Sequence, residues 1–158
     1  MATALAVEQP AVVLGPEQGE RLSYRGVEIV FKSPAGSAEG WTVLDYTMAP
    51  RQFGAPLHYH RELIESFYVL SGKLWLRAGD QEIDGGPGTF VLVPPGVLHS
   101  FANRTDEPAR FLCHASNRNH KTFLTQLFHL ATTLPSWPPS DPGEIIRLGE
   151  RYDTVYVL

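Results

Sequence analysis

The sequence predicts an all-β sandwich or barrel followed by a helical C-terminal extension. Between residue 10 and about residue 116 the chain returns repeatedly to short apolar or alternating runs separated by Gly, Pro, Asn and Asp, a pattern typical of many short strands joined by turns. After residue 118, apolar residues recur at helical spacing instead. The chain has 158 residues, of which 43% are hydrophobic and 19% charged, as expected for one folded domain.

Each predicted strand is a run of four to nine residues rich in β-branched and aromatic types. The runs are 11–14, 27–32, 41–49, 65–70, 73–78, 89–93, 99–103 and 109–115. Turn-forming residues separate them. Ser71 and Gly72 join two strongly strand-like runs, and a glycine can adopt the positive φ of a tight turn, so we predict a β-hairpin there.

The C-terminal extension is predicted to contain two helices. One apolar stripe runs through the first helix and is expected to cap the barrel: Phe123, Leu124, Leu127, Phe128, Ala131 and Leu134. Asn119 is its predicted N-cap. A proline-rich break follows, and Asp141-Pro142-Gly143-Glu144 predicts a second helix that ends near Tyr152. We therefore divide the chain into a barrel over 1–118, with its core at about 24–116, and a helical extension over 119–158 that packs on it.

Composition excludes several classes of protein. The net charge is −4 and no cluster of Lys and Arg is present, so we expect no nucleic-acid partner. Cys113 is the single cysteine, which rules out an intrachain disulfide and a cysteine-rich zinc module. No run approaches the roughly 18 apolar residues of a membrane span. The first 13 residues lack the basic start of a signal peptide, so we expect a cytoplasmic protein without a membrane partner.

Three histidines and one glutamate form the candidate site. His58 and His60 are two residues apart, so on a strand both rings point to the same face. Glu65 opens the next strand, and His99 follows a Pro-Pro-Gly turn that sets the direction of its own strand. The pattern favours a metal site. The alternative is a metal-free barrel whose interior polar residues hydrogen-bond one another, at a high cost of burial.

Other polar residues carry weaker expectations. Tyr59 should point outward between the two histidines, and Asn103 is expected to hydrogen-bond a turn or strand end. Cys113 and His114 are neighbours on one strand, so only one of them can face the interior; His114 is either an acid or base behind the metal ligands or structural. The remaining two histidines, at 120 and 129, are expected to face solvent.

The two motifs resemble those of the cupin superfamily. The first matches HxHx4Ex6G through His58, His60, Glu65 and Gly72, and the second matches Gx5PxGx2Hx3N through Gly88, Pro94, Gly96, His99 and Asn103. Gln52 replaces the glycine that usually opens the first motif, and Gly54 is the nearest substitute. The resemblance covers about residues 24–116.

This resemblance implies a single-domain cupin, a double-stranded β-helix or jelly-roll barrel. It also implies one divalent transition metal ion per chain, held in the interior by His58, His60, Glu65 and His99. Imidazole and carboxylate ligands suit Fe, Mn, Ni, Zn or Cu. Four protein ligands leave open positions on a five- or six-coordinate ion.

The expected function is that of a metal-dependent oxygenase resembling small bacterial quercetin-dioxygenase-like cupins. The predicted inward faces are mainly aliphatic and aromatic, which favours an aromatic or otherwise apolar small-molecule substrate. Glu65 would also act catalytically by accepting a hydroxyl proton. A non-oxidative isomerase, cyclase or decarboxylase and a non-catalytic small-molecule binder remain open. We also expect a homodimer, because the run 11–14 would present an apolar strand edge.

Overall fold

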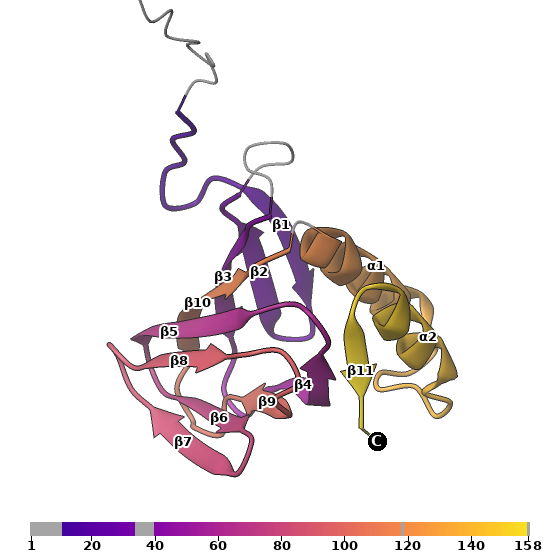
Figure 1. The fold of residues 1–158 in the computed structure, drawn as a ribbon. Coiled ribbons are helices and arrows are strands. Elements are labelled where there is room, and N and C mark those ends of the chain that lie inside the picture. Colours follow the sequence, from indigo (N-terminus) through magenta and orange to yellow (C-terminus); the bar gives the residue numbers. More distant parts are fainter. Residues whose placement is uncertain (1–10, 34–39, 118, 158) are drawn as a thin grey trace, which may run out of the picture.

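The computed structural model describes residues 11–33, 40–117 and 119–157. Its strands form two antiparallel sheets that face each other (Figure 1). The six-stranded sheet has the order β1 (Glu20–Tyr24), β2 (Val27–Phe31), β3 (Thr42–Met48), β10 (Ala109–Ala115), β5 (Glu65–Ser71) and β8 (Phe90–Val93). The five-stranded sheet has the order β11 (Thr154–Tyr156), β4 (Phe53–His60), β9 (His99–Ala102), β6 (Leu74–Ala78) and β7 (Gln81–Gly85). The predicted all-β barrel is confirmed.

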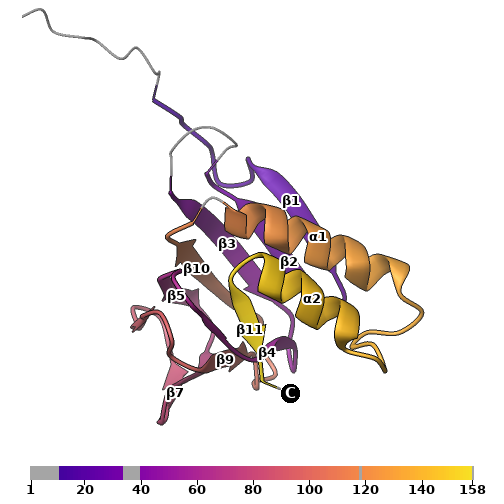
Figure 2. The ribbon, with the colours of Figure 1, turned by 45° about the vertical axis from the view of Figure 1, so that its right-hand side comes forward.

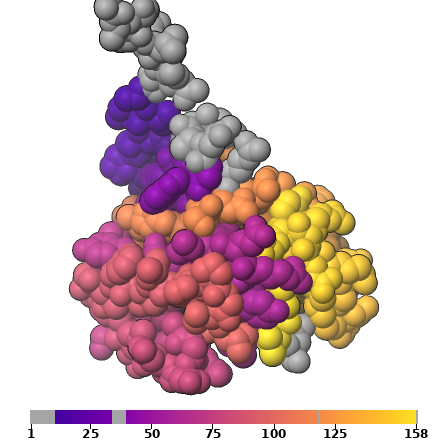
Figure 3. Space-filling model, in the orientation of Figure 1, coloured from indigo at the N-terminus to yellow at the C-terminus, as the bar shows by residue number. Residues whose placement is uncertain are grey.

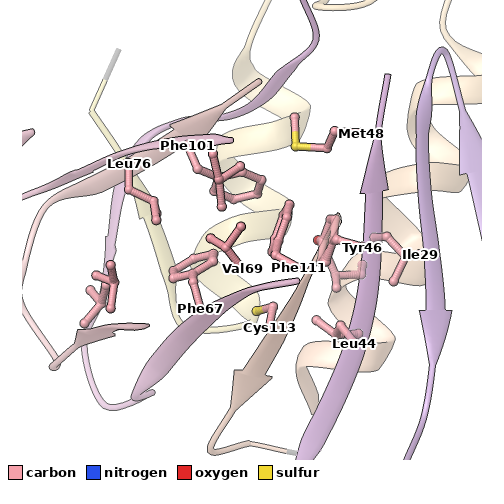
Figure 4. Close-up of a cluster of buried hydrophobic side chains, with 14 of the residues drawn as sticks. Ile29, Leu44, Tyr46, Met48, Phe67, Val69, Leu76, Phe101, Phe111 and Cys113 are labelled. Carbon is pink, nitrogen blue, oxygen red and sulfur yellow. The ribbon is translucent and has the colours of Figure 1, made fainter. Parts of the chain in front are cut away.

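Aromatic side chains fill the space between the two sheets. Phe67, Phe111 and Tyr46 come from the larger sheet and Phe101 from the smaller one, and they point toward one another (Figure 4). The rings of Tyr46 and Phe111 are stacked, with centroids 4.9 Å apart, and those of Phe67 and Phe101 are 5.4 Å apart. Burial alternates along β5 and β10, as expected for strands with one face on the core.

The C-terminal extension lies against the open side of the barrel. Helix α1 (Asn119–Thr133) packs on β1, and α2 (Gly143–Arg151) lies beside α1 (Figure 2). Strand β11 then pairs with β4, so the end of the chain becomes part of the smaller sheet. In the space-filling view the C-terminal residues adjoin the barrel as one continuous surface (Figure 3). None of the helices in the described part of the chain is long and apolar enough to cross a membrane.

The helix starts differ slightly from expectation. The backbone N–H of Asn119 donates to the side-chain oxygen of Asn117 at 2.7 Å, so the capping side chain lies two residues before the predicted one. The predicted start of α2 is wrong by one residue: Pro142, not Asp141, is the N-cap residue, although the Asp141 carboxylate accepts the N–H of Gly143 at 2.9 Å where the helix begins.

The predicted hairpin at Ser71-Gly72 is wrong. Strand β5 pairs with β10 and β8, whereas β6 pairs with β7 and β9, so the chain crosses from one sheet to the other at this point. Gly72 is still required: its φ is 70°, and a Cβ there would lie 2.1 Å from the carbonyl oxygen of Pro108. Glycine signals a sharp turn, but it does not say which strands pair across it.

Two further expectations need correction. Residues 11–14, which are described, form no strand, and the argument for a dimer from that edge therefore fails. Strands β1 and β7 were missed, because ERLSY and QEIDG are too polar to stand out as apolar runs, and β4 and β11 were not among the predicted runs either. Residues 1–10 and most of the predicted turn at 33–40 lie outside the described residues.

Candidate metal centre

Three strands from both sheets bring the candidate ligands together. His58 and His60 lie on β4 and His99 lies opposite His58 on β9, while Glu65 begins β5 in the other sheet. One ligand atom from each of the four side chains lies within 4.8 Å of the others, and all four residues are buried. The site therefore joins the two sheets at one end of the barrel.

Backbone carbonyl groups orient all three imidazole rings in the same way. Each Nδ1 is within hydrogen-bond distance of a carbonyl oxygen: 2.8 Å for His58 and Pro56, 2.9 Å for His99 and Val97, and 3.1 Å for His60 and Asp153. A carbonyl oxygen can only accept, so each Nδ1 carries its hydrogen. In the neutral rings the three Nε2 atoms then present lone pairs, as metal ligands require.

The carboxylate of Glu65 places a negative charge close to the Nε2 atoms of His60 and His99. Its Oε2 lies 2.9 Å from Nε2 of His99 and 3.5 Å from Nε2 of His60. Its Oε1 accepts a hydrogen bond from Sγ of Cys113 at 3.0 Å. Burial opposes ionisation, but His60 and His99, when their rings carry a proton on Nε2, outweigh it by hydrogen bonding and charge and hold the pKa of Glu65 well below its usual range. Glu65 is therefore a carboxylate, although it is 4% exposed.

The arrangement fits a cation. A carboxylate oxygen and an imidazole lone pair repel each other at 2.9 Å unless a proton or a metal ion lies between them. Burial, and then the neighbouring His99, lower the pKa of His58 to about 3, which keeps that ring neutral and able to ligate. Among the described residues, Nε2 of His60 is buried without a hydrogen-bond partner. The cluster can hold a metal ion.

The turn before the C-terminal strand supports this site through Asp153. Its carboxylate accepts the backbone N–H groups of Arg61, Glu62 and Leu63 at 2.9, 3.0 and 2.8 Å, and its carbonyl oxygen faces Nδ1 of His60. The segment between the second histidine and Glu65 is thus fixed by a residue about ninety positions later in the chain. The sequence carries no local signal for this contact.

A cavity of about 400 Å³ opens beside the cluster. His58 and Glu65 are part of its wall, and the rest is mainly apolar. Helix α1 covers one side with much of its predicted apolar stripe: Phe123, Leu124, Leu127, Phe128 and Ala131. The tail contributes Tyr156, which β11 places next to the ring of His58. The stripe therefore lines a space next to the cluster as well as covering the barrel.

The prediction for His120 is wrong. This residue is 5% exposed, lines the cavity, and places Nε2 3.8 Å from Oε1 of Glu65. The helix starts directly over the site, so the face that carries Phe123 and Leu124 also turns His120 inward. His129, on the same helix, is exposed as predicted.

The remaining predictions concern residues around the site. Cys113 faces inward and His114 outward, where its ring meets Trp41 edge-on at 6.0 Å; His114 is therefore not part of the cluster. Asn103 is confirmed as a hydrogen bonder of a turn, because its amide nitrogen donates to the carbonyl oxygens of Ala49 and Glu107 at 2.9 and 2.7 Å. Tyr59 points away from the cluster and is half-buried.

Known proteins resemble this chain in sequence and structure. The cupin domain family model matches residues 44–115. A crystal structure described as a sugar phosphate isomerase from Silicibacter pomeroyi is 31% identical, covers 58% of this chain and 60% of its own, and has a TM-score of 0.54. The polyketide cyclase RemF from Streptomyces resistomycificus is 20% identical, with coverages of 67% and 79% and a TM-score of 0.59, which shows the fold alone.

A curated sequence also matches over a short stretch. Quercetin 2,3-dioxygenase from Bacillus subtilis is 41% identical over 44 residues, or 28% of this chain and 13% of that protein. The chain thus spans only a small part of the dioxygenase and less than two thirds of the isomerase structure. Together with the two-sheet barrel and the cluster of three histidines and one glutamate, these matches support a cupin-superfamily protein.

Proposed function

We propose that this protein is a cupin that acts as a metal-dependent oxygenase on a hydroxylated aromatic small molecule. The observation that carries the proposal is the position of the cluster in the wall of an apolar cavity of about 400 Å³. A cavity of this size suits a small organic ligand, and Glu65 and His58 contribute polar groups of the cluster to its wall.

His58, His60, Glu65 and His99 would hold the ion. Imidazole nitrogen with one carboxylate oxygen suits Fe, Mn, Ni, Zn or Cu, and the cluster offers no thiolate that would select a softer ion. When bound, such an ion supplies Lewis acidity and open coordination positions for substrate oxygen atoms or dioxygen. The carbonyl groups that orient the rings keep the ligands in place before the ion binds.

The cavity wall supports an aromatic substrate. Eight Phe, Tyr and Trp side chains line it: Tyr24, Tyr46, Phe53, Phe101, Phe123, Phe128, Trp137 and Tyr156. Such side chains bind flat rings by stacking or edge-to-face contact. Glu65 is ionised and borders the same space, so its role beyond ligation would be to accept the proton of a substrate hydroxyl group.

A non-oxidative metalloenzyme is the second candidate. It is favoured by the 31% identity to a protein described as a sugar phosphate isomerase. A sugar phosphate needs cationic side chains around its phosphate group. Among the described residues that line the cavity, Arg25 is the one Lys or Arg side chain, and it is exposed. The lining therefore supports the aromatic substrate better.

Oxygen consumption separates these candidates. Protein loaded separately with Fe, Mn, Ni, Zn or Cu is mixed with quercetin or catechol in an oxygen-electrode cell, and a parallel set is kept under argon. The oxygenase proposal predicts oxygen uptake that matches substrate loss and stops under argon. Turnover that continues under argon would support the non-oxidative enzyme instead. Tight binding without any product would leave a binding protein.

A further inference from the structure

Two tyrosine side chains border the candidate site from opposite sheets. Tyr46 belongs to β3 in the larger sheet, and Tyr156 belongs to β11 at the edge of the smaller sheet. Both side chains line the cavity beside the cluster. The ring of Tyr156 lies next to that of His58, with centroids 5.8 Å apart, and the ring of Tyr46 is stacked on Phe111. The packing of two strands therefore fixes both phenol groups at the cavity wall.

The hydroxyl groups of both tyrosines are accessible from the cavity. Among the described residues, the fully buried polar side-chain atoms without a hydrogen-bond partner are Nε2 of His60 and Nδ1 of His120. Neither tyrosine hydroxyl is one of them, and neither forms a hydrogen bond with the described part of the chain, so both keep accessible surface. Burial raises the pKa of both phenols, because they are shielded from bulk water. Their accessible surface therefore faces the cavity.

Both hydroxyl groups also lie near the carboxylate of Glu65. Besides burial, the negative charge of Glu65 contributes to the raised pKa of each phenol, and the charge of Tyr156 contributes to that of Tyr46. When Glu65 accepts the proton of a substrate hydroxyl group, the O–H bond breaks and its electron pair stays on the substrate oxygen, which becomes negative. A phenol O–H is a donor that stabilises such an oxygen without adding a charge to an apolar cavity.

We propose that the hydroxyl groups of Tyr46 and Tyr156 bind the substrate by donating hydrogen bonds to its oxygen atoms beside the cluster. This assignment rests on the function proposed above. It specifies the substrate as an aromatic ring with oxygen atoms on neighbouring carbons, because two donors serve the same end of the cavity. Tyr46 lies inside the region that the family model matches and Tyr156 lies beyond its end at residue 115, so the C-terminal extension completes the site.

Three variants test the assignment. Tyr46→Phe and Tyr156→Phe each remove one hydroxyl group and keep the ring. Tyr59→Phe is the matched control, because Tyr59 lies on the neighbouring strand β4 but points away from the cluster. Each protein is loaded with Zn²⁺, which has no redox chemistry, and its metal content and thermal unfolding are measured first. A loss of metal or of stability is thereby separated from a loss of ligand binding.

Binding is then measured by fluorescence titration under argon. The probes are 2,3-dihydroxynaphthalene and naphthalene, which has the same ring system but no oxygen. For Tyr46→Phe and Tyr156→Phe the proposal predicts a Kd for the diol that is higher by about tenfold or more, the size expected for a hydrogen bond to a charged oxygen. The Kd of naphthalene should change by less than about twofold. Tyr59→Phe should match the wild-type protein with both probes.

The absorption spectrum of the bound diol gives a second readout. Its band moves when a hydroxyl group loses its proton, so a pH titration gives the apparent pKa of the bound diol. This pKa should be higher by about one unit or more in Tyr46→Phe and Tyr156→Phe, because each variant lacks a donor that stabilises the anion. It should be unchanged in Tyr59→Phe.

The outcomes separate the two proposals. Equal losses for both probes, no loss for the diol, or a loss confined to one of the two variants would overturn the tyrosine pair, even if the protein consumes oxygen. Selective losses in both variants of a protein that consumes no oxygen would retain the pair and overturn the oxygenase. If neither probe binds the wild-type protein, the hydroxylated aromatic substrate is wrong and both proposals fail.

Discussion

Replacing Asp153 with glycine should both destabilise the protein and weaken metal binding. The carboxylate accepts three backbone N–H bonds from residues 61–63 at 2.8–3.0 Å. Two of these bonds are exposed and contribute about 0.5–1 kcal/mol each, and the partly buried one to Leu63 contributes about 1.5 kcal/mol. Glycine adopts the φ of 67° at this position without strain, which stabilises the folded state by about 1 kcal/mol. It also gives the unfolded chain more conformational freedom, which costs about 1 kcal/mol, so the two effects cancel. We expect Asp153→Gly to lose about 3 kcal/mol.

Urea unfolding of the metal-free protein measures this loss. A decrease of about 3 kcal/mol corresponds to a melting temperature lower by about 6–12 °C. In a separate titration the Kd for Zn²⁺ should rise about tenfold, because the carbonyl oxygen that orients His60 belongs to the same residue. Asp106→Gly is the control: its carboxylate forms an exposed pair with Arg51, away from β11, so both measurements should stay near wild type. An Asp153→Gly protein as stable as the control would refute the reasoning.

Three further predictions concern the crossover, the cavity and the assembly of the chain. Gly72→Ala places a Cβ 2.1 Å from a carbonyl oxygen at a φ of 70° and should lower the free energy of unfolding by at least about 3 kcal/mol. Gly86→Ala, with open space around the new Cβ, should lower it by less than about 1 kcal/mol, and urea unfolding of both variants compares the two losses. Leu127→Trp should fill part of the cavity, so calorimetry with the Zn²⁺-loaded protein should find the aromatic diol 2,3-dihydroxynaphthalene bound at least tenfold more weakly, while elemental analysis finds unchanged metal content. We propose that the edge strand β8 forms the homodimer contact, since Leu92 is 54% exposed. Leu92→Glu should then lower the mass found by ultracentrifugation. A wild-type protein that is monomeric at every concentration would refute this proposal.

Local patterns were sufficient to predict most of the barrel and the composition of the cluster. Alternation along 65–70 and 109–115 predicted strands correctly, because one face of each is buried against the same core. The spacing of His58 and His60 placed both rings on one face, since side chains repeat every second residue on a strand. Once a strand forms, the spacing of two residues along it determines whether their side chains share a face, so this feature can be predicted from the sequence alone.

These local patterns could not predict contacts between segments that are distant in the sequence. The turn at Gly72 was predicted correctly as a sharp bend, but its two strands belong to different sheets, which depends on long-range pairing. His120 was expected in solvent because a single polar residue near a helix start is usually exposed. Its burial follows from where α1 crosses the barrel, and the role of Asp153 follows from the return of β11 to β4. Both depend on the packing of the C-terminal extension.

The metal content of the purified protein tests the central claim most directly. Wild-type protein prepared without chelators, and a His99→Ala variant, are compared by elemental analysis. The account predicts about one transition metal ion per chain in the wild type and its loss in the variant. Because the intrinsic affinities follow the Irving–Williams order, both proteins are also reconstituted with Fe, Mn, Ni, Zn and Cu in turn. If neither protein retains any of these ions, the cluster is a hydrogen-bonded core of a metal-free barrel, and the account is contradicted.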